Sequence, residues 1–158
     1  MGRQKPKKKN QKRQWEKVSD HFALKDFTCK SDPERQEFKL SLGLVGGLEM
    51  LRSKAQNRVN ILKGFESKES AQQQGRVKRN YHRLGVAADI TVDNRSLKDI
   101  FLIALDIPEF NGIGINVDDN HIHVDTRKGD RKIWVEKDND EHEISEEDAR
   151  QMALNIGE

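Results

Sequence analysis

Two short segments of the chain contain residue types that bind metals. The first has His82 and Asp89, seven residues apart, and the second has His121 and His123 with Asp125 two residues later. His82, Asp89 and His123 would give a metal ion two imidazoles and one carboxylate, which suits catalytic zinc because one position stays open for water. The alternative is that the histidines are ordinary hydrogen-bonded residues and Asp89 caps a turn, since such clusters also arise by chance.

A shared metal requires the chain to bend between His82 and Asp89. Seven extended residues span roughly 23 Å, which is too far for two ligands of one ion. Gly85 is the residue between them that can best adopt a turn conformation. If Asp89 lies in a strand beside the strand that contains His123, the two side chains can face each other. The spacing permits a metal site without requiring one.

A long helix is predicted in the first half of the chain. Asp32 is a suitable N-cap, and Pro33 is favoured in a first helical turn. Gly46 and Gly47 lower the helix propensity, so we attribute them to close packing against a neighbour. The buried face recurs at three- and four-residue spacing and consists of Phe38, Leu42, Val45, Leu48 and Leu51.

Two further helices are predicted from their capping residues. One begins at Ser96 and ends before Pro108. The other begins at Ser145, the first residue of the Ser145-x-x-Asp148 pattern that resembles a capping box, and continues to about Ile156. Residues 68–79 are polar and glutamine-rich, which is typical of a loop or a surface helix.

Short apolar-rich runs between these helices predict a small sheet. Asp118, Asp119 and Asn120 are turn formers between two such runs, which indicates a hairpin. We expect the last run to form an edge strand. The whole pattern is typical of an α+β fold with a small, mainly antiparallel sheet and flanking helices. The predicted strands cover residues 59–62, 85–92, 110–117, 121–126 and 132–135.

Composition bounds the class of protein. The chain has 158 residues, of which 34% are hydrophobic and 35% charged, enough for one compact core. There is no apolar run long enough to span a bilayer, so we expect no membrane insertion. Cys29 is the single cysteine, which excludes an internal disulfide and a cysteine-rich zinc finger. We expect a monomer.

Charge divides the chain into three parts. Residues 1–14 form a basic tail without apolar anchors, which we expect to be disordered. Residues 15–135 form the main predicted domain, which contains all the candidate metal ligands, and residues 136–158 form an acidic C-terminal segment with a short helix. Nucleic-acid binding is expected only through the tail. No apolar stretch follows the basic residues, so we expect no signal peptide and synthesis in the cytoplasm.

Three motifs follow one another along the chain, namely His82-x-x-Gly85-x-Ala87-x-Asp89-Ile90, Gly112-x-Gly114 and His121-x-His123-Val124-Asp125. Together they resemble the zinc D-Ala-D-Ala carboxypeptidase group, which shares its fold with the hedgehog signalling domain and with several phage endolysins. The resemblance covers roughly residues 18–130. It implies a hedgehog/DD-peptidase-like fold, Zn²⁺ bound by His82, Asp89 and His123, and hydrolysis of peptide bonds in peptidoglycan stem or cross-bridge peptides.

The same resemblance implies roles for the neighbouring residues. A carboxylate takes a proton from the attacking water and passes it to the leaving amine. Asp119 and Asp118 are the candidates, and the alternative is that both are simple turn formers. His121 matches a motif histidine beside the metal and could donate a proton or stabilise the oxyanion. Asp125 is expected to orient a zinc-binding histidine or to cap its strand.

Three positions differ from the family pattern. The mildest difference is Asn80, where family members commonly have serine. Glu66 stands where an arginine is expected, and it would repel a substrate carboxylate. Lys63, Arg76 and Arg79 are the candidate replacements. Asn120 stands where several relatives have an acid. These differences keep a second function open, a zinc-binding module that binds peptide or protein without turnover. For a peptidase, delivery to the cell wall with a phage or prophage lysis system would suit the absent signal.

Overall fold

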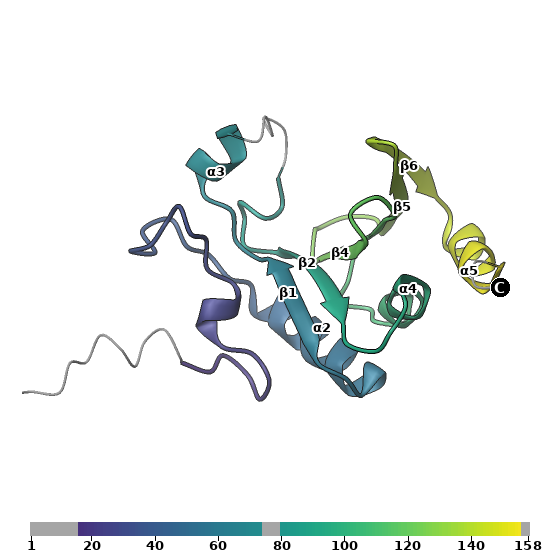
Figure 1. Cartoon of the computed structure of the whole chain (residues 1–158), viewed down its shortest axis with the longest axis horizontal. Coiled ribbons are helices and arrows are strands. Elements are labelled where there is room, and N and C mark those ends of the chain that lie inside the picture. The colour runs from purple at the N-terminus through teal and green to yellow at the C-terminus, as the bar shows by residue number, and fades with distance from the viewer. Residues whose placement is uncertain (1–15, 74–79, 156–158) are drawn as a thin grey trace, which may run out of the picture.

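A computed structural model of the chain describes residues 16–73 and 80–155 (Figure 1). The tail predicted for residues 1–14 lies outside this range, as do Arg76 and Arg79. Within it, the predicted α+β fold is confirmed. Six described strands form one sheet in the order β1-β2-β4-β3-β5-β6, and β3 pairs with β5 in parallel whereas the other pairs are antiparallel. The strands are β1 (Val59–Lys63), β2 (Ala87–Val92), β3 (Gly112–Asn116), β4 (His121–Asp125), β5 (Lys132–Lys137) and β6 (Asp140–Ile144).

Helices cover one face of this sheet. Helix α2 (Leu42–Ala55) contacts β1 and β2, α4 (Leu97–Leu105) contacts β2, β3 and β4, and α5 (Glu146–Asn155) contacts β5 (Figure 1). The core between the two layers contains alternate strand residues, because successive side chains of a strand point to opposite faces. Ile90, Ile113, Ile122 and Val124 are among them. Their polar neighbours therefore point to the other face, where the predicted metal ligands on the strands lie.

The long helix begins nine residues later than predicted. Ser41 is its N-cap, and the Ser41 hydroxyl accepts a hydrogen bond from the helix N-terminus. Asp32 instead closes a turn, because its carboxylate accepts from two backbone N–H groups four and five residues later. Arg35 has a left-handed φ of 56°, which a helix cannot contain. Leu42, placed on the buried face by its spacing, is 79% exposed.

The glycine pair of α2 has two different explanations. A Cβ on Gly47 would lie 2.5 Å from Cε1 of Phe110, so the predicted close packing is confirmed at this position. A Cβ on Gly46 would meet nothing within 4 Å, so the packing explanation is wrong there. Helix α2 therefore approaches the residues before β3 along one side only.

The remaining predicted elements are found close to their expected places. Ser96 caps α4, Ser145 caps the N-terminus of α5, and the predicted hairpin is the β3–β4 pair. The polar segment after β1 contains a short surface helix, α3 (Lys68–Gln73), and a 3₁₀ turn, Leu24–Asp26, precedes α2. No helix in the described residues is long and apolar enough to cross a membrane.

The prediction of an edge strand at residues 132–135 is wrong. Strand β5 lies between β3 and β6, and β6 is the edge strand. Sequence reasoning missed β6 because its residues, Asp140 to Ile144, are almost all charged or polar and have no apolar alternation.

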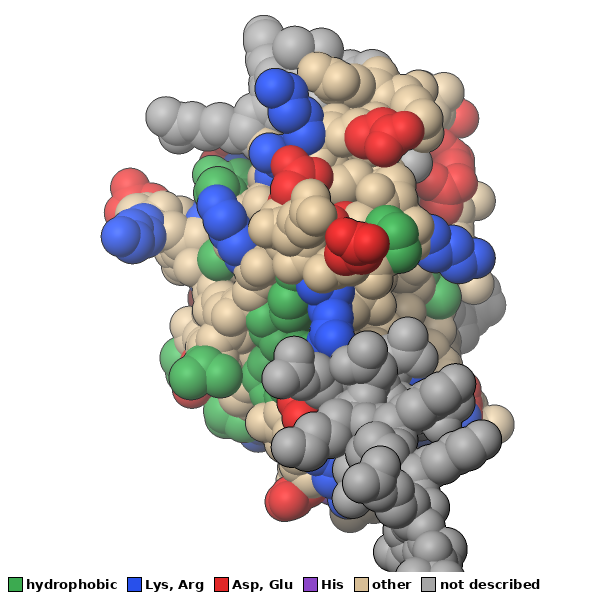
Figure 2. Space-filling view, turned by 90° about the vertical axis from the view of Figure 1, so that its left-hand side faces the viewer, with side chains coloured by type: hydrophobic (Ala, Val, Ile, Leu, Met, Phe, Trp, Pro, Cys, Tyr) green, Lys and Arg blue, Asp and Glu red, His purple; other side chains and the backbone are tan. Residues whose placement is uncertain are grey.

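Seen from the side of the N-terminal segment (Figure 2), acidic and basic side chains are interspersed around hydrophobic ones.

Candidate metal centre

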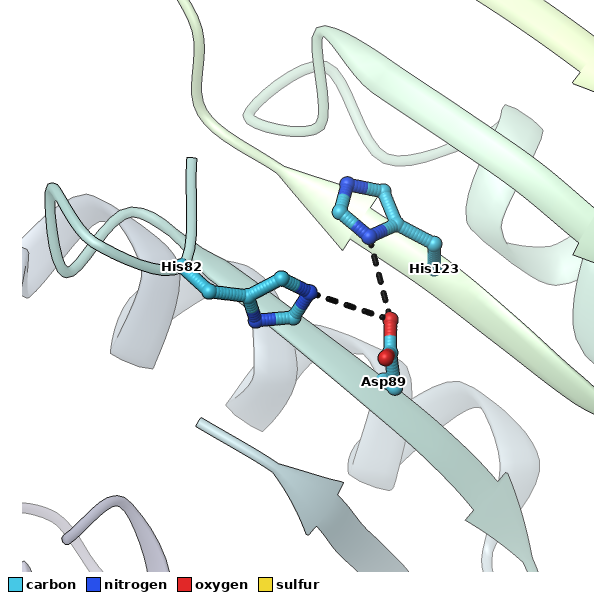
Figure 3. Close-up of side chains that lie close together, drawn as sticks. All are labelled: His82, Asp89 and His123. Atoms are coloured by element: carbon cyan, nitrogen blue, oxygen red, sulfur yellow. Dashed lines mark hydrogen bonds and ion pairs between the residues drawn. The ribbon is translucent and has the colours of Figure 1, made fainter. Parts of the chain in front are cut away.

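The structure brings His82, Asp89 and His123 together on the sheet face that the helices leave uncovered (Figure 3). Nε2 of His82 is 3.3 Å from Oδ1 of Asp89, and Nδ1 of His123 is 3.0 Å from the same oxygen. The three potential ligand atoms all lie within 4.8 Å of one another. One carboxylate oxygen therefore faces two imidazole nitrogens that come from distant parts of the chain.

Two backbone features create this arrangement. Gly85 has a φ of +71°, so the chain turns between His82 and Asp89 as the spacing required. A Cβ at Gly85 would lie 2.3 Å from the carbonyl oxygen of Lys39, so the turn also needs glycine for space. On the sheet, Asp89 in β2 pairs directly with His123 in β4, which places both side chains on the same face.

The second nitrogen of each imidazole has a fixed acceptor. Nδ1 of His82 is 2.9 Å from the carbonyl oxygen of Gly64, to which it must donate. Nε2 of His123 is 2.7 Å from Oδ2 of the buried Asp125. Such outer acceptors orient metal-binding histidines and fix their tautomers. They leave Nε2 of His82 and Nδ1 of His123 pointing toward Asp89, as a shared metal ion would require.

The electrostatics of the cluster favour a cation next to Asp89. Burial alone would lower the pKa of His123, but its hydrogen bonds to Asp125 and Asp89 outweigh burial and raise that pKa to about 9. Burial would raise the pKa of Asp89, yet the hydrogen bonds from His123 and His82 hold it well below its usual range. Without a metal, a proton on His123 supplies the positive charge. Two imidazoles and an ionised carboxylate form a donor set that fits a divalent metal ion.

His121 lies at the margin of this cluster. Its side chain is on the same face as His123, two residues away on β4, and its Nε2 is 3.7 Å from Oδ2 of Asp89. This distance is longer than those of His82 and His123 to the same carboxylate. The position suits a group that contacts a substrate more than it suits a further ligand.

Asp118 and Asp119 lie in the turn between β3 and β4. The backbone N–H of Asp119 donates to Oδ1 of Asn116, and its carboxylate is 3.4 Å from Nδ2 of the same residue. The carboxylate of Asp118 accepts from the backbone N–H of Asp138 at 2.6 Å. Both acids therefore have contacts that stabilise turns, and the metal-binding cluster of the described residues does not include them.

Glu66 is not an exposed acid, which corrects the expectation that it repels a substrate. Its side chain is fully buried, and Oε1 is 2.9 Å from Nζ of Lys63. Asn80 also donates to the carboxylate. The negative charge is therefore balanced inside the protein. Because Lys63 provides that balance, its predicted role as a substitute for the missing arginine competes with an internal ion pair.

Sequence reasoning missed Trp134, which packs against the cluster. Its ring centroid is 5.2 Å from that of His123. A Cβ on Gly114 would lie 2.3 Å from the indole, so glycine in β3 allows the ring to lie across the strand. The signal was present in the Gly112-x-Gly114 motif, because glycine inside a strand often marks the close approach of another group.

Sequence reasoning also missed Glu136 on the same sheet face. It lies two residues after Trp134, so the two side chains share a face of β5. Burial and the neighbouring Glu141 raise the pKa of Glu136. An acid with a raised pKa near a candidate active site is a candidate proton carrier.

The family model for Peptidase M15 matches residues 20–125 of the chain. The match includes His82, Asp89 and His123, and it ends at Asp125. None of the curated proteins matches the chain.

Proposed function

Because the chain belongs to the peptidase M15 family, we propose that it is a zinc metallopeptidase that hydrolyses peptide bonds in peptidoglycan stem or cross-bridge peptides. The observation that carries this proposal is the cluster of His82, Asp89 and His123 within the matched residues. Its two imidazoles and single carboxylate match the ligand count of catalytic zinc sites.

The chain's own residues would hold the ion and keep it reactive. His82 and His123 each present one nitrogen to Asp89, and Gly64 and Asp125 fix the opposite nitrogens. When bound, Zn²⁺ supplies a Lewis acid that polarises the scissile carbonyl and makes water nucleophilic near neutral pH. The cluster lies on the face of the sheet away from the helix layer, which suits an extended peptide substrate.

Proton transfer is assigned to residues around this centre. In our proposal Asp119 or Asp118 accepts the proton of the attacking water and passes it to the leaving amine. His121, beside Asp89, donates a hydrogen bond to the oxyanion. Glu136 is a further candidate acceptor, because its pKa is already raised. Substitution of each acid to its amide would distinguish among them by the loss of turnover at unchanged zinc content.

A second function has its own support. The carboxylate of Asp119 contacts Asn116 in its own turn, and that of Asp118 accepts from the backbone of Asp138 in the next turn. Glu66 is buried at the position where the family resemblance predicts a substrate-binding arginine. A protein with these properties could bind zinc and a peptide without turnover. This binding module shares the metal centre with the peptidase and differs from it only in the missing reaction.

One experiment separates the two functions. We expect purified protein to contain about one zinc ion per chain and to cleave a D-Ala-D-Ala or cross-bridge peptide, whereas His123→Ala and His82→Ala should lose both properties. His142→Ala is the matched control, because its side chain is 64% exposed and pairs only with Asp140 among the described residues. Zinc without turnover on any of these peptides would leave the binding module, and a protein without zinc would exclude both functions.

A further inference from the structure

Arg127 is held more tightly than a surface arginine needs to be. Its Nε is 2.8 Å from Oδ1 of Asp125, and its Nη2 is 2.7 Å from Oδ2. This two-pronged geometry uses the planar fork of the guanidinium, which a lysine cannot reproduce. Asp125 is fully buried, so the ion pair is shielded from water. The contact therefore defines the orientation of the Asp125 carboxylate.

Aromatic rings hold the guanidinium in place. Its central carbon is 4.1 Å from the ring centroid of Tyr81 and 5.1 Å from that of Trp134. Cation–ring contacts of this kind favour a fixed arginine position. Tyr81 precedes His82, and Trp134 packs against His123. Each ring that contacts Arg127 is therefore next to one of the two candidate metal-binding histidines.

The same carboxylate oxygen connects Arg127 to the metal centre. Oδ2 of Asp125 is 2.7 Å from Nη2 of Arg127 and 2.7 Å from Nε2 of His123. Gly112 leaves space for this arrangement, because a Cβ there would lie 2.3 Å from both Asp125 oxygens and 2.5 Å from Nε of Arg127. If the guanidinium were removed, each Asp125 oxygen would lose one of its two partners. Oδ1 would keep only the backbone N–H of residue 127, at 3.1 Å, and Oδ2 would keep only His123, so the carboxylate would be held less firmly.

We infer that Arg127 is a positioning residue for the metal site: it fixes Asp125, which in turn fixes the His123 imidazole with Nδ1 toward the ion. This role rests on the proposed metal centre but adds a residue beyond the matched range, since the family match ends at Asp125. The consequence is that zinc affinity depends on a guanidinium that touches neither the ion nor a ligand.

The test measures zinc affinity rather than turnover. The dissociation constant of Zn²⁺ is determined by competition with a chromophoric chelator for wild type, Arg127→Ala, Arg127→Lys, Asp125→Asn and the double variant Asp125→Asn/Arg127→Ala. We expect Arg127→Ala to weaken binding about 10- to 100-fold, as for other outer-shell partners. The dissociation constant of Arg127→Lys should lie between those of Arg127→Ala and wild type. Arg150→Ala, which removes an exposed pair with Asp106, should bind zinc as wild type does.

The double variant separates positioning from general stability. If Arg127 acts through Asp125, the arginine substitution should have less than about a threefold effect in the Asp125→Asn background, because neighbours in one network are not additive. Multiplicative effects, or wild-type affinity in Arg127→Ala, would overturn the inference. If Arg127→Ala does not fold, as judged by thermal unfolding, the comparison is made with Arg127→Lys.

The inference and the proposed function fail differently. Wild type that binds zinc without peptide hydrolysis would contradict the peptidase and leave the positioning role intact. An active wild type whose affinity is indifferent to Arg127 would overturn the positioning role alone. Wild type without zinc affinity would overturn both.

Discussion

At the scale of single residues, Asp89 is the carboxylate that all three histidines of the site face. It faces His82 and His123 with one oxygen and His121 with the other. In the metal-free protein, the raised pKa of His123 means that a proton balances this carboxylate. A metal ion must displace that proton, so metal binding and protonation compete for the same nitrogen.

Because of this competition, the free energy of unfolding should depend on pH. The sign of that dependence should differ between the metal-free and the zinc-bound protein. The folded pKa of His123 is raised to about 9. Its contribution to the stability of metal-free protein is therefore complete below the unfolded value of about 6.5 and is lost as the pH rises through the folded value. The loss should be on the order of 3 kcal/mol at most. With excess zinc, stability should instead increase over the same range, because the nitrogen is released for the ion.

Urea unfolding at pH 6 and pH 9, with a chelator or with zinc, measures both slopes. Asp89 and Asp125 have lowered pKa values, so their contributions are present above the unfolded pKa of about 3.9 and are lost on acidification below it. The contributions of these two carboxylates to stability therefore stay constant between pH 6 and pH 9. In the metal-free protein, His123→Ala should remove most of the loss of stability between pH 6 and pH 9. Metal-free protein that is as stable at pH 9 as at pH 6 would contradict the assigned role of His123.

At the scale of elements, neighbouring positions of one helix have opposite requirements. Gly47 of α2 lies against the Phe110 ring, whereas Gly46 faces open space. We expect Gly46→Ala to stabilise the protein by about 0.5–1 kcal/mol, because alanine loses less backbone entropy in a helix. Gly47→Ala should destabilise it by about 1–3 kcal/mol through overpacking. Chemical unfolding of the two variants measures the difference, and equal effects would show that α2 does not approach Phe110 as described.

Pairing between strands, more than any one element, builds the site. The direct pairing of β2 with β4 aligns Asp89 with His123, and β3 carries the glycines over which Trp134 and Arg127 lie. A one-residue shift of β4 would turn His123 toward the core, since strand side chains alternate. The hairpin turn at residues 118–120 sets this register, and Asn120 has the left-handed φ of 55° that such a turn uses.

At the scale of the whole molecule, residues 136–155 of the acidic C-terminal segment are part of the sheet and core. Strand β6 pairs with β5, and Ala149 and Ala153 of α5 are buried against the rest of the core. The described residues after Val135 therefore contribute to the same folded unit as the candidate metal centre.

Two adjacent residues of α5 test this contribution. Ala153 is 1% exposed and Leu154 is 62% exposed. We expect Ala153→Asp to destabilise the protein by more than about 2 kcal/mol, because it buries an unpaired charge. Leu154→Asp places the same charge at the same helix end and should cost less than about 1 kcal/mol. Urea midpoints of the two variants measure the difference, and similar values would indicate that α5 does not cover the core.

Local patterns were sufficient for several features of this fold. The serine caps at Ser96 and Ser145, the turn at Gly85 and the β3–β4 hairpin each depend on residues a few positions apart. The grouping of His82, Asp89 and His123 was also predicted. Their spacing only permitted it, and the resemblance of the motifs to the zinc carboxypeptidase group pointed to these three residues.

Other features depend on residues that are distant in the chain, and only the tertiary structure decided them. Asp32 closes a turn instead of starting a helix, and the almost wholly polar segment at residues 140–144 forms strand β6 by pairing with β5. The ion pair of Glu66 and the link from Arg127 through Asp125 to His123 belong to the same class. The sequence by itself determined which side chains could bind a metal, because their chemistry is local. What surrounds and orients them was decided by long-range packing and pairing, whose free energies do not appear in any local pattern.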